Sequence, residues 1–77
     1  MPVDPTWDYR IREKIAGWTV ETKRPDGLTE TNVREGARSE AFDFVESVAG
    51  DTSLIKIEFR SGDADWMKGD RFRREFA

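Results

Sequence analysis

The chain has 77 residues and a formal net charge of −3, and it contains neither cysteine nor histidine. Without cysteine there is no disulfide or thiolate metal site, and without histidine the chain lacks the side chain that most often works as an acid or base near neutral pH. A chain of this length fits one domain, residues 1–77, which on folding buries only about 60% of the surface that its unfolded chain exposes.

Membrane insertion and secretion are not expected. No apolar run approaches the roughly 20 residues that span a bilayer, and the N-terminal residues lack the basic region and apolar stretch of a signal peptide. We therefore expect a cytoplasmic protein without a membrane contact, acting in the host cytoplasm if a phage encodes it.

The N-terminal segment, residues 4–17, has two interpretations. Trp7, Ile11 and Ile15 recur every four residues and Gly17 follows them, as in an amphipathic helix with a glycine after its end. The same segment also alternates apolar and charged side chains, as in a half-buried strand. We favour the helix and keep the strand as the alternative.

A β-hairpin is predicted next. Residues 18–23 and 28–33 have strand composition, and they flank Arg24-Pro25-Asp26-Gly27, in which proline presets one turn position and glycine supplies a left-handed one. The second strand has almost no apolar face, so we place it at the sheet edge. The expected facing pairs are Val20 with Asn32 and Trp18 with Arg34.

The main helix is predicted over residues 40–49, between Ser39 as its N-terminal cap and Gly50 beyond its end. Residues 52–60 form the clearest strand, because apolar and charged side chains alternate there. Residues 70–77 fit a short helix or an edge strand. The expected buried stripe of the main helix is Ala41, Phe44, Val45 and Val48, widened by Phe42 and Ala49.

Together these elements predict an α+β fold. We expect a small antiparallel sheet of three to four strands, the helix at about 40–49 packed across one face, and short helices at the two ends of the chain. Nine aromatic residues are expected to form the core. They are Trp7, Tyr9, Trp18, Phe42, Phe44, Phe59, Trp66, Phe72 and Phe76.

Catalysis and cofactor binding are not predicted. No spacing singles out a pair of carboxylates, the serines have no histidine partner, and the six glycines sit singly at turns and caps rather than in a phosphate loop. Asp63 and Asp65 gather oxygen atoms with Ser61 and Asp70, but their spacing does not match a calcium loop. We interpret that segment as a polar turn, with no metal and no cofactor.

Charge is segregated along the chain, and this gives the leading hypothesis. Residues 39–65 hold seven acids and two bases. We predict a non-enzymatic module that binds another protein through an acidic helix face or through the edge strand 28–34, as a phage or mobile-element inhibitor would. The residues of the acidic face are Glu40, Asp43, Glu46 and Asp51.

Two alternatives remain. Residues 68–77 hold four bases and two acids, interleaved with aromatic rings, which is typical of a nucleic-acid contact. The third hypothesis is a structural subunit that self-associates by edge pairing, so that the protein is a monomer or a homodimer. The nucleic-acid candidates are Lys23, Arg24, Trp66, Lys68, Arg71, Arg73 and Arg74.

The stretch from Gly17-Trp18 through Pro25-Asp26-Gly27 to Ser39-Glu40-Ala41-Phe42 resembles the strand-turn-strand-helix modules with which some phage-type integrases bind DNA. The resemblance covers less than half of the chain. Such modules are basic where this chain is acidic, so we assign no family.

Overall fold

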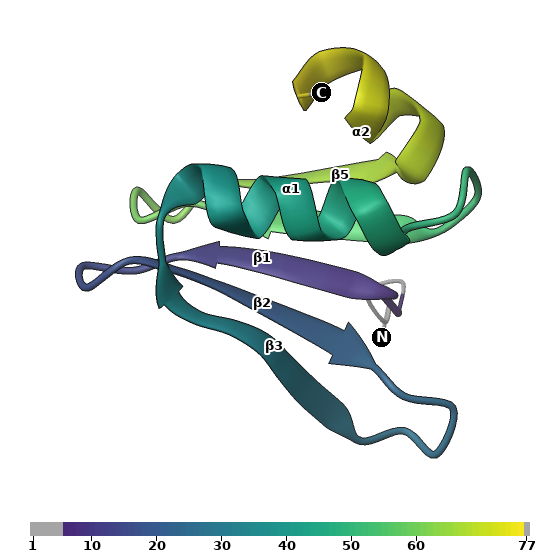
Figure 1. Ribbon diagram of the computed structural model, residues 1–77, viewed down its shortest axis with the longest axis horizontal. Helices are drawn as coiled ribbons and strands as arrows, with labels where there is room; N and C mark the ends of the chain where they lie inside the picture. The colour runs from purple at the N-terminus through teal and green to yellow at the C-terminus, as the bar shows by residue number, and fades with distance from the viewer. Residues whose placement is uncertain (1–5, 77) are drawn as a thin grey trace.

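The computed structural model describes residues 6–76, which form five strands and two helices (Figure 1). The α+β class is as predicted, although the sheet has five strands rather than three or four. The elements in chain order are β1 (Tyr9–Glu13), β2 (Trp18–Lys23), β3 (Thr29–Gly36), α1 (Arg38–Val48), β4 (Leu54–Glu58), β5 (Ala64–Lys68) and α2 (Gly69–Phe76).

The strands lie in the order β3-β2-β1-β4-β5. Neighbouring strands are antiparallel except β1 and β4, which are parallel, so the sheet is mostly antiparallel, with one parallel pair that the sequence did not indicate. The parallel pair arises because β4 follows α1, and a helix gives the chain the length that a crossover between parallel strands requires. The two parallel strands lie next to each other in the middle of the sheet.

The favoured N-terminal helix is wrong, because residues 9–13 form the strand β1. The expected apolar stripe does not pack together, since Ile15 is 87% exposed. Ile15 instead belongs to a tight turn closed by hydrogen bonds in both directions between the backbones of Lys14 and Gly17. Residues 4 and 5, which the helix prediction also included, lie outside the described part.

The hairpin of β2 and β3 is confirmed, with β3 at the sheet edge. Its turn is the expected one, because Gly27 has φ of 89° and donates its N–H to the Arg24 carbonyl. The predicted register is wrong, because β3 carries two irregularities that shift its pairing. The observed facing pairs are Val20 with Val33 and Trp18 with Gly36.

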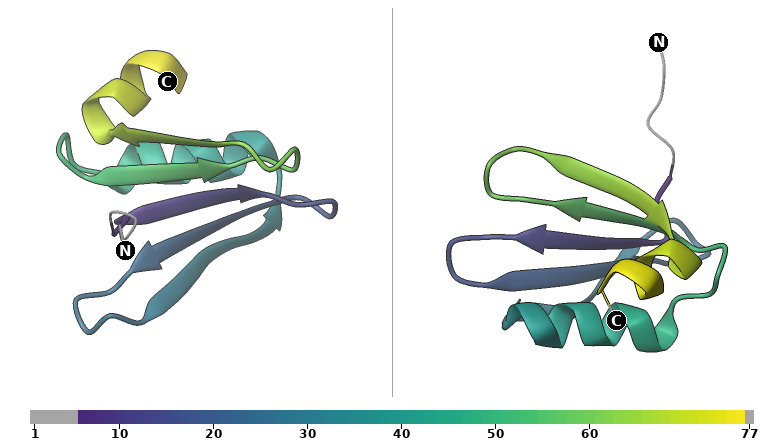
Figure 2. Two further views of the ribbon diagram at one scale, coloured as in Figure 1. Left: turned by 180° about the vertical axis from the view of Figure 1, so that it is seen from behind. Right: turned by 90° about the horizontal axis from the view of Figure 1, so that it is seen from above.

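Both helices lie on the same side of the sheet (Figure 2). The main helix begins at Arg38, earlier than predicted, and Ala37 rather than Ser39 is its N-cap residue. Its predicted buried side is correct for Ala41, Phe42, Val45 and Ala49 and wrong for Val48, which is 45% exposed. The helical alternative is confirmed for residues 70–76 of the C-terminal segment, and residue 77 lies outside the described part. Neither helix within residues 6–76 is long and apolar enough to cross a membrane.

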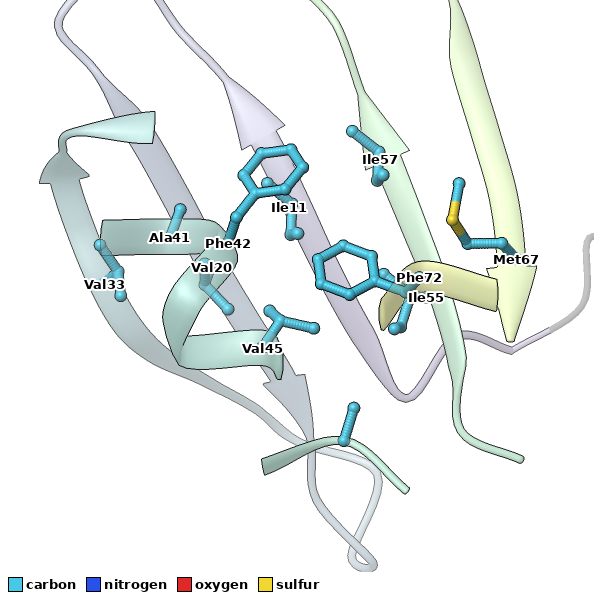
Figure 3. Close-up of a cluster of buried hydrophobic side chains, with 11 residues drawn as sticks. Ile11, Val20, Val33, Ala41, Phe42, Val45, Ile55, Ile57, Met67 and Phe72 are labelled. Carbon is cyan, nitrogen blue, oxygen red and sulfur yellow. The ribbon is translucent and has the colours of Figure 1, made fainter. Parts of the chain in front are cut away.

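The core fills the space between this side of the sheet and the two helices (Figure 3). Its centre is aliphatic rather than aromatic, with Ile11, Ile55 and Ile57 fully buried. Phe42 and Phe72 are the only two of the nine aromatic residues in the buried set, and they stack at 5.6 Å between ring centroids. Phe72 thereby joins α2 to α1. The aromatic residues that pack partly buried against this core are Tyr9, Trp18, Phe44, Phe59 and Phe76.

The junction of β5 and α2 packs closely against the loop after α1. Gly69 donates its N–H to the Ser53 carbonyl, and Asp70 donates to the Asp51 carbonyl. A Cβ atom at Gly69 would collide with the backbone carbonyl of Gly50. Glycine is required at position 69 because a side chain would have no space there. The backbone conformation does not require it, because Gly69 has no positive φ.

We expect Gly69→Ala to lower the free energy of unfolding by about 1–3 kcal/mol, the usual range for overpacking a filled site. Gly50→Ala is the matched control, because the nearest atom to its added Cβ would be the Ser53 Oγ at an ordinary 3.5 Å. Urea unfolding followed by circular dichroism measures both variants. Equal stability of the two would contradict the close contact.

Candidate binding surface on the open face of the sheet

The sheet face opposite the helices carries a concentration of basic side chains. We call it the open face, because no helix among residues 6–76 covers it; in Figure 2 (left) the strands lie in front of α1. In β1, β2, β4 and β5, the positions on this face hold five bases and two acids, whereas the whole chain has a net charge of −3. The charged residues are Arg10, Arg12, Lys23, Lys56 and Lys68, with Glu21 and Glu58.

Two tryptophans lie on the open face, so the prediction that they belong to the core is wrong. Trp7 precedes β1, and its ring has the Arg10 guanidinium at 4.7 Å and the Lys23 ammonium at 5.6 Å. Trp66 in β5 faces Lys56 across the strand pair, and the Lys56 ammonium lies 5.0 Å from its ring. Each tryptophan is half-buried and has a cation within cation–π distance.

Ion pairs link the charges in the middle of the open face. Arg10 donates from Nε and Nη2 to Glu21 Oε1 at 3.0 and 2.7 Å. Glu58 is held less directly, because its oxygens lie 3.6 Å from Arg10 Nη1, 3.7 Å from Lys56 Nζ and 3.9 Å from Arg12 Nε. Glu58 Oε2 is inaccessible to solvent and accepts no hydrogen bond.

The structure separates the predicted nucleic-acid residues into two groups. Lys23, Trp66 and Lys68 lie on the open face, whereas the other predicted bases lie in α2 or in the hairpin turn. Those other bases are paired with carboxylates. The pairs are Arg24 with Asp26 at 3.4 Å, Arg71 with Glu75 at 3.0 Å, Arg73 with Asp51 at 2.8 Å and Arg74 with Asp70 at 4.0 Å.

The predicted acidic face lies on α1, apart from the open face. Glu40 and Asp43 are exposed and Glu46 is half-buried, and none of the three forms an ion pair within residues 6–76. Asp51 differs, because it follows the helix and binds Arg73. Three of the four predicted acids therefore remain unneutralised on one helix.

The edge strand β3 is poorly suited to pairing with another strand. Two register shifts interrupt its pairing with β2, and Glu35 has a positive φ of 54°. Bulges and charged side chains are the usual means by which proteins prevent edge-to-edge association. These features weaken the support for edge pairing, both with a partner protein and between two copies.

Neither a pocket nor a cluster of three or more carboxylates placed to hold a metal ion is found in residues 6–76. Ser61 and Asp63, from the oxygen-rich segment, hydrogen-bond to each other in the β4–β5 turn. The Gly62 φ of 98° completes that turn.

Sequence reasoning missed four of the basic and aromatic residues of the open face: Trp7, Arg10, Arg12 and Lys56. The signal was present, because Arg10 and Arg12 flank the buried Ile11, and Lys56 lies between the buried Ile55 and Ile57. The helical interpretation of the first segment concealed it. Only the parallel pairing of β1 with β4 places the two sets of charges side by side.

Comparison with known proteins identifies no matching family model, no similar curated protein and no similar solved structure.

Arg73 has a structural role that separates it from the other α2 bases. Its guanidinium donates to Asp51 and to the Ala49 carbonyl at the end of α1. We expect Arg73→Gln to lower the free energy of unfolding by about 1 kcal/mol, as for other hydrogen bonds of a charged group at a partly exposed site. Arg71→Gln should change it by less than about 0.5 kcal/mol, because its pair is exposed on one helix. Chemical denaturation compares the two; equal effects would contradict the anchoring role.

Proposed function

We propose that the protein binds single-stranded nucleic acid through the open face of its sheet. The observation that supports this most is the combination of Trp7 and Trp66 with five basic side chains on one uncovered surface. Proteins that bind single strands combine cations for the phosphates with aromatic rings on which bases stack. The proposal is for a cytoplasmic protein that performs no catalysis.

The acidic net charge of the chain is compatible with this function. At physiological ionic strength exposed charges are screened over about 8 Å, so a phosphate on the open face responds mainly to the charges beside it. The open face has an excess of three positive charges over β1, β2, β4 and β5. The unpaired acids Glu40 and Asp43 lie on α1, across the sheet from this surface.

A single strand suits the open face better than a duplex does. The four strands from β2 to β5 span roughly 14 Å, because adjacent strands are about 4.8 Å apart. A sheet of that width offers a surface on which unpaired bases can spread, whereas a duplex keeps its bases stacked and presents only their edges. For a base to stack on the ring face that a cation now occupies, the lysine or arginine side chain must leave that face. The displaced side chain would then bind a phosphate of the same strand.

Binding should be measured by fluorescence anisotropy with labelled single-stranded DNA and RNA, and with the matching duplex. We expect micromolar or tighter binding of a single strand at low salt and weaker binding of the duplex. Trp66→Ala should weaken binding about 10-fold, because base–aromatic stacking contributes about 1–3 kcal/mol. The absence of any binding to a single strand at low salt would refute the proposal.

Two charge-matched double variants separate the open face from general electrostatics. Lys23→Gln with Lys68→Gln removes two positive charges from the open face, and Arg71→Gln with Arg74→Gln removes two from the exposed side of α2. The first should flatten the dependence of log K on log salt by about 0.7 for each lost phosphate contact. Equal losses in the two double variants would contradict an open-face site.

A second function is proposed for the acidic side of α1, which would bind a basic protein surface. Its support is the set Glu40, Asp43 and Glu46, none of which is neutralised by an ion pair within the described residues. An inhibitor encoded by a phage or mobile element would use such a surface. Complementary charge mainly increases the association rate and selects the partner.

For this second function, the triple variant Glu40→Lys, Asp43→Lys and Glu46→Lys should lose capture of the partner while remaining folded. Affinity capture from nuclease-treated lysate of the source cell, with circular dichroism as the folding check, measures both. The open-face variant with Lys23→Gln and Lys68→Gln should retain the partner. A partner captured equally well by the triple variant would exclude this face.

A further inference from the structure

We infer that Arg10, Arg12 and Lys56 form a phosphate-binding position at the centre of the open face, and that the Glu58 carboxylate occupies it in the free protein. The inference rests on the proposed nucleic-acid function and specifies one contact of it. A phosphodiester group of the bound strand would take the place of the carboxylate.

The first observation is a like-charge pair in the middle of the sheet. The parallel register of β1 and β4 sets Arg10 beside Lys56 and Arg12 beside Glu58. Like charges directly opposite each other on neighbouring strands destabilise a sheet unless an anion lies between them. Glu58 supplies that anion in the free protein, because its Oε2 lies 3.6 Å from Arg10 Nη1 and 3.7 Å from Lys56 Nζ.

The second observation is that Glu58 fits this position poorly. Charge-assisted hydrogen bonds between nitrogen and oxygen usually measure about 2.7–2.9 Å. Three cations surround the Glu58 carboxylate, but their nitrogen atoms lie 3.6–3.9 Å from its oxygens, and Oε2 accepts no hydrogen bond. Glu21 is different, because Arg10 donates two short hydrogen bonds to it.

The third observation is that the cations retain donors for an incoming anion. Arginine has five N–H donors and lysine three. Arg10 uses Nε and Nη2 for Glu21, which leaves its Nη1 directed to the Glu58 side, and neither Arg12 nor Lys56 donates a hydrogen bond to a carboxylate within residues 6–76. A phosphodiester has two non-bridging oxygens that accept hydrogen bonds, and it is bound well by paired guanidinium and ammonium groups.

Trp66 makes this position suitable for a nucleotide rather than for an isolated ion. Lys56 belongs both to the cation group and to the pair with Trp66, whose ring lies 5.0 Å from its ammonium. A phosphate bound by Lys56 would therefore lie beside a ring on which the adjoining base can stack. Phosphate and base would be held by neighbouring strands, β4 and β5.

The decisive variant is Glu58→Gln, which removes the internal anion and keeps the size of the side chain. We expect tighter binding of a labelled single strand, and a salt dependence of log K that is steeper by about 0.7, the value of one added phosphate contact on a single strand. Glu21→Gln is the matched control, because it removes the same charge from the same face without vacating the position. Glu21→Gln should change the affinity for the strand but leave the slope of log K against log salt as in the wild type.

A second variant tests which cations take part. Arg12→Gln in the Glu58→Gln background should abolish the gain, as a double-mutant cycle of coupled residues requires. Inorganic phosphate provides an independent probe: titration into the Glu58→Gln protein should shift the NMR signals of the Arg10 and Arg12 Nε–H groups. The same titration into the wild-type protein should shift them less.

The outcomes distinguish this inference from the proposed function. If the wild type binds a single strand but Glu58→Gln behaves like Glu21→Gln, the phosphate position is wrong and the function stands. If neither protein binds a strand, the function is wrong. In that case, a shift of the Arg12 signal on addition of inorganic phosphate would support the anion-binding position without the nucleic-acid function. The absence of a shift would show that the position is wrong as well.

Discussion

The structure depends on one constraint, which is that the fully buried aliphatic side chains of the strands all lie on one face of the sheet. Ile11, Val20, Ile55 and Ile57 all point to that side and are fully buried there. Both helices must therefore pack on the same side, because only there can they remove apolar surface from water. The opposite side is left without a helix, and its strand positions are free to carry charge.

The parallel contact between β1 and β4 connects this constraint to the candidate site. On the buried side it sets Ile11 beside Ile57, and on the open side it sets Arg10 beside Lys56. One register thus determines both the centre of the core and the centre of the basic surface. A shift of one residue would place the charges in the core, so burial of the isoleucines fixes the position of the cations.

Local patterns predicted several elements but not their arrangement. The hairpin turn, the main helix and the strand around Ile55 and Ile57 were predictable, because turn chemistry and periodicity are contained in short segments. The first strand was not, since its turn at Ile15 and Ala16 lacks the usual Asn-Gly signal and Trp7, Ile11 and Ile15 imitate a helical stripe. The predicted register of β3 was wrong because the sequence pattern of a polar strand does not indicate where a bulge lies.

The candidate surface was predictable only in part, for a related reason. Lys23, Trp66 and Lys68 were selected from composition, but the α2 arginines selected with them are paired with nearby carboxylates. The remaining open-face residues come from strands 40 or more positions apart in the chain, so no window of sequence contains them together.

The net charge of the chain was misleading as well. When helices cover one face of a sheet, acidic residues can lie on the helices and basic residues on the uncovered face. A chain that is acidic overall can then present a basic surface on that uncovered face.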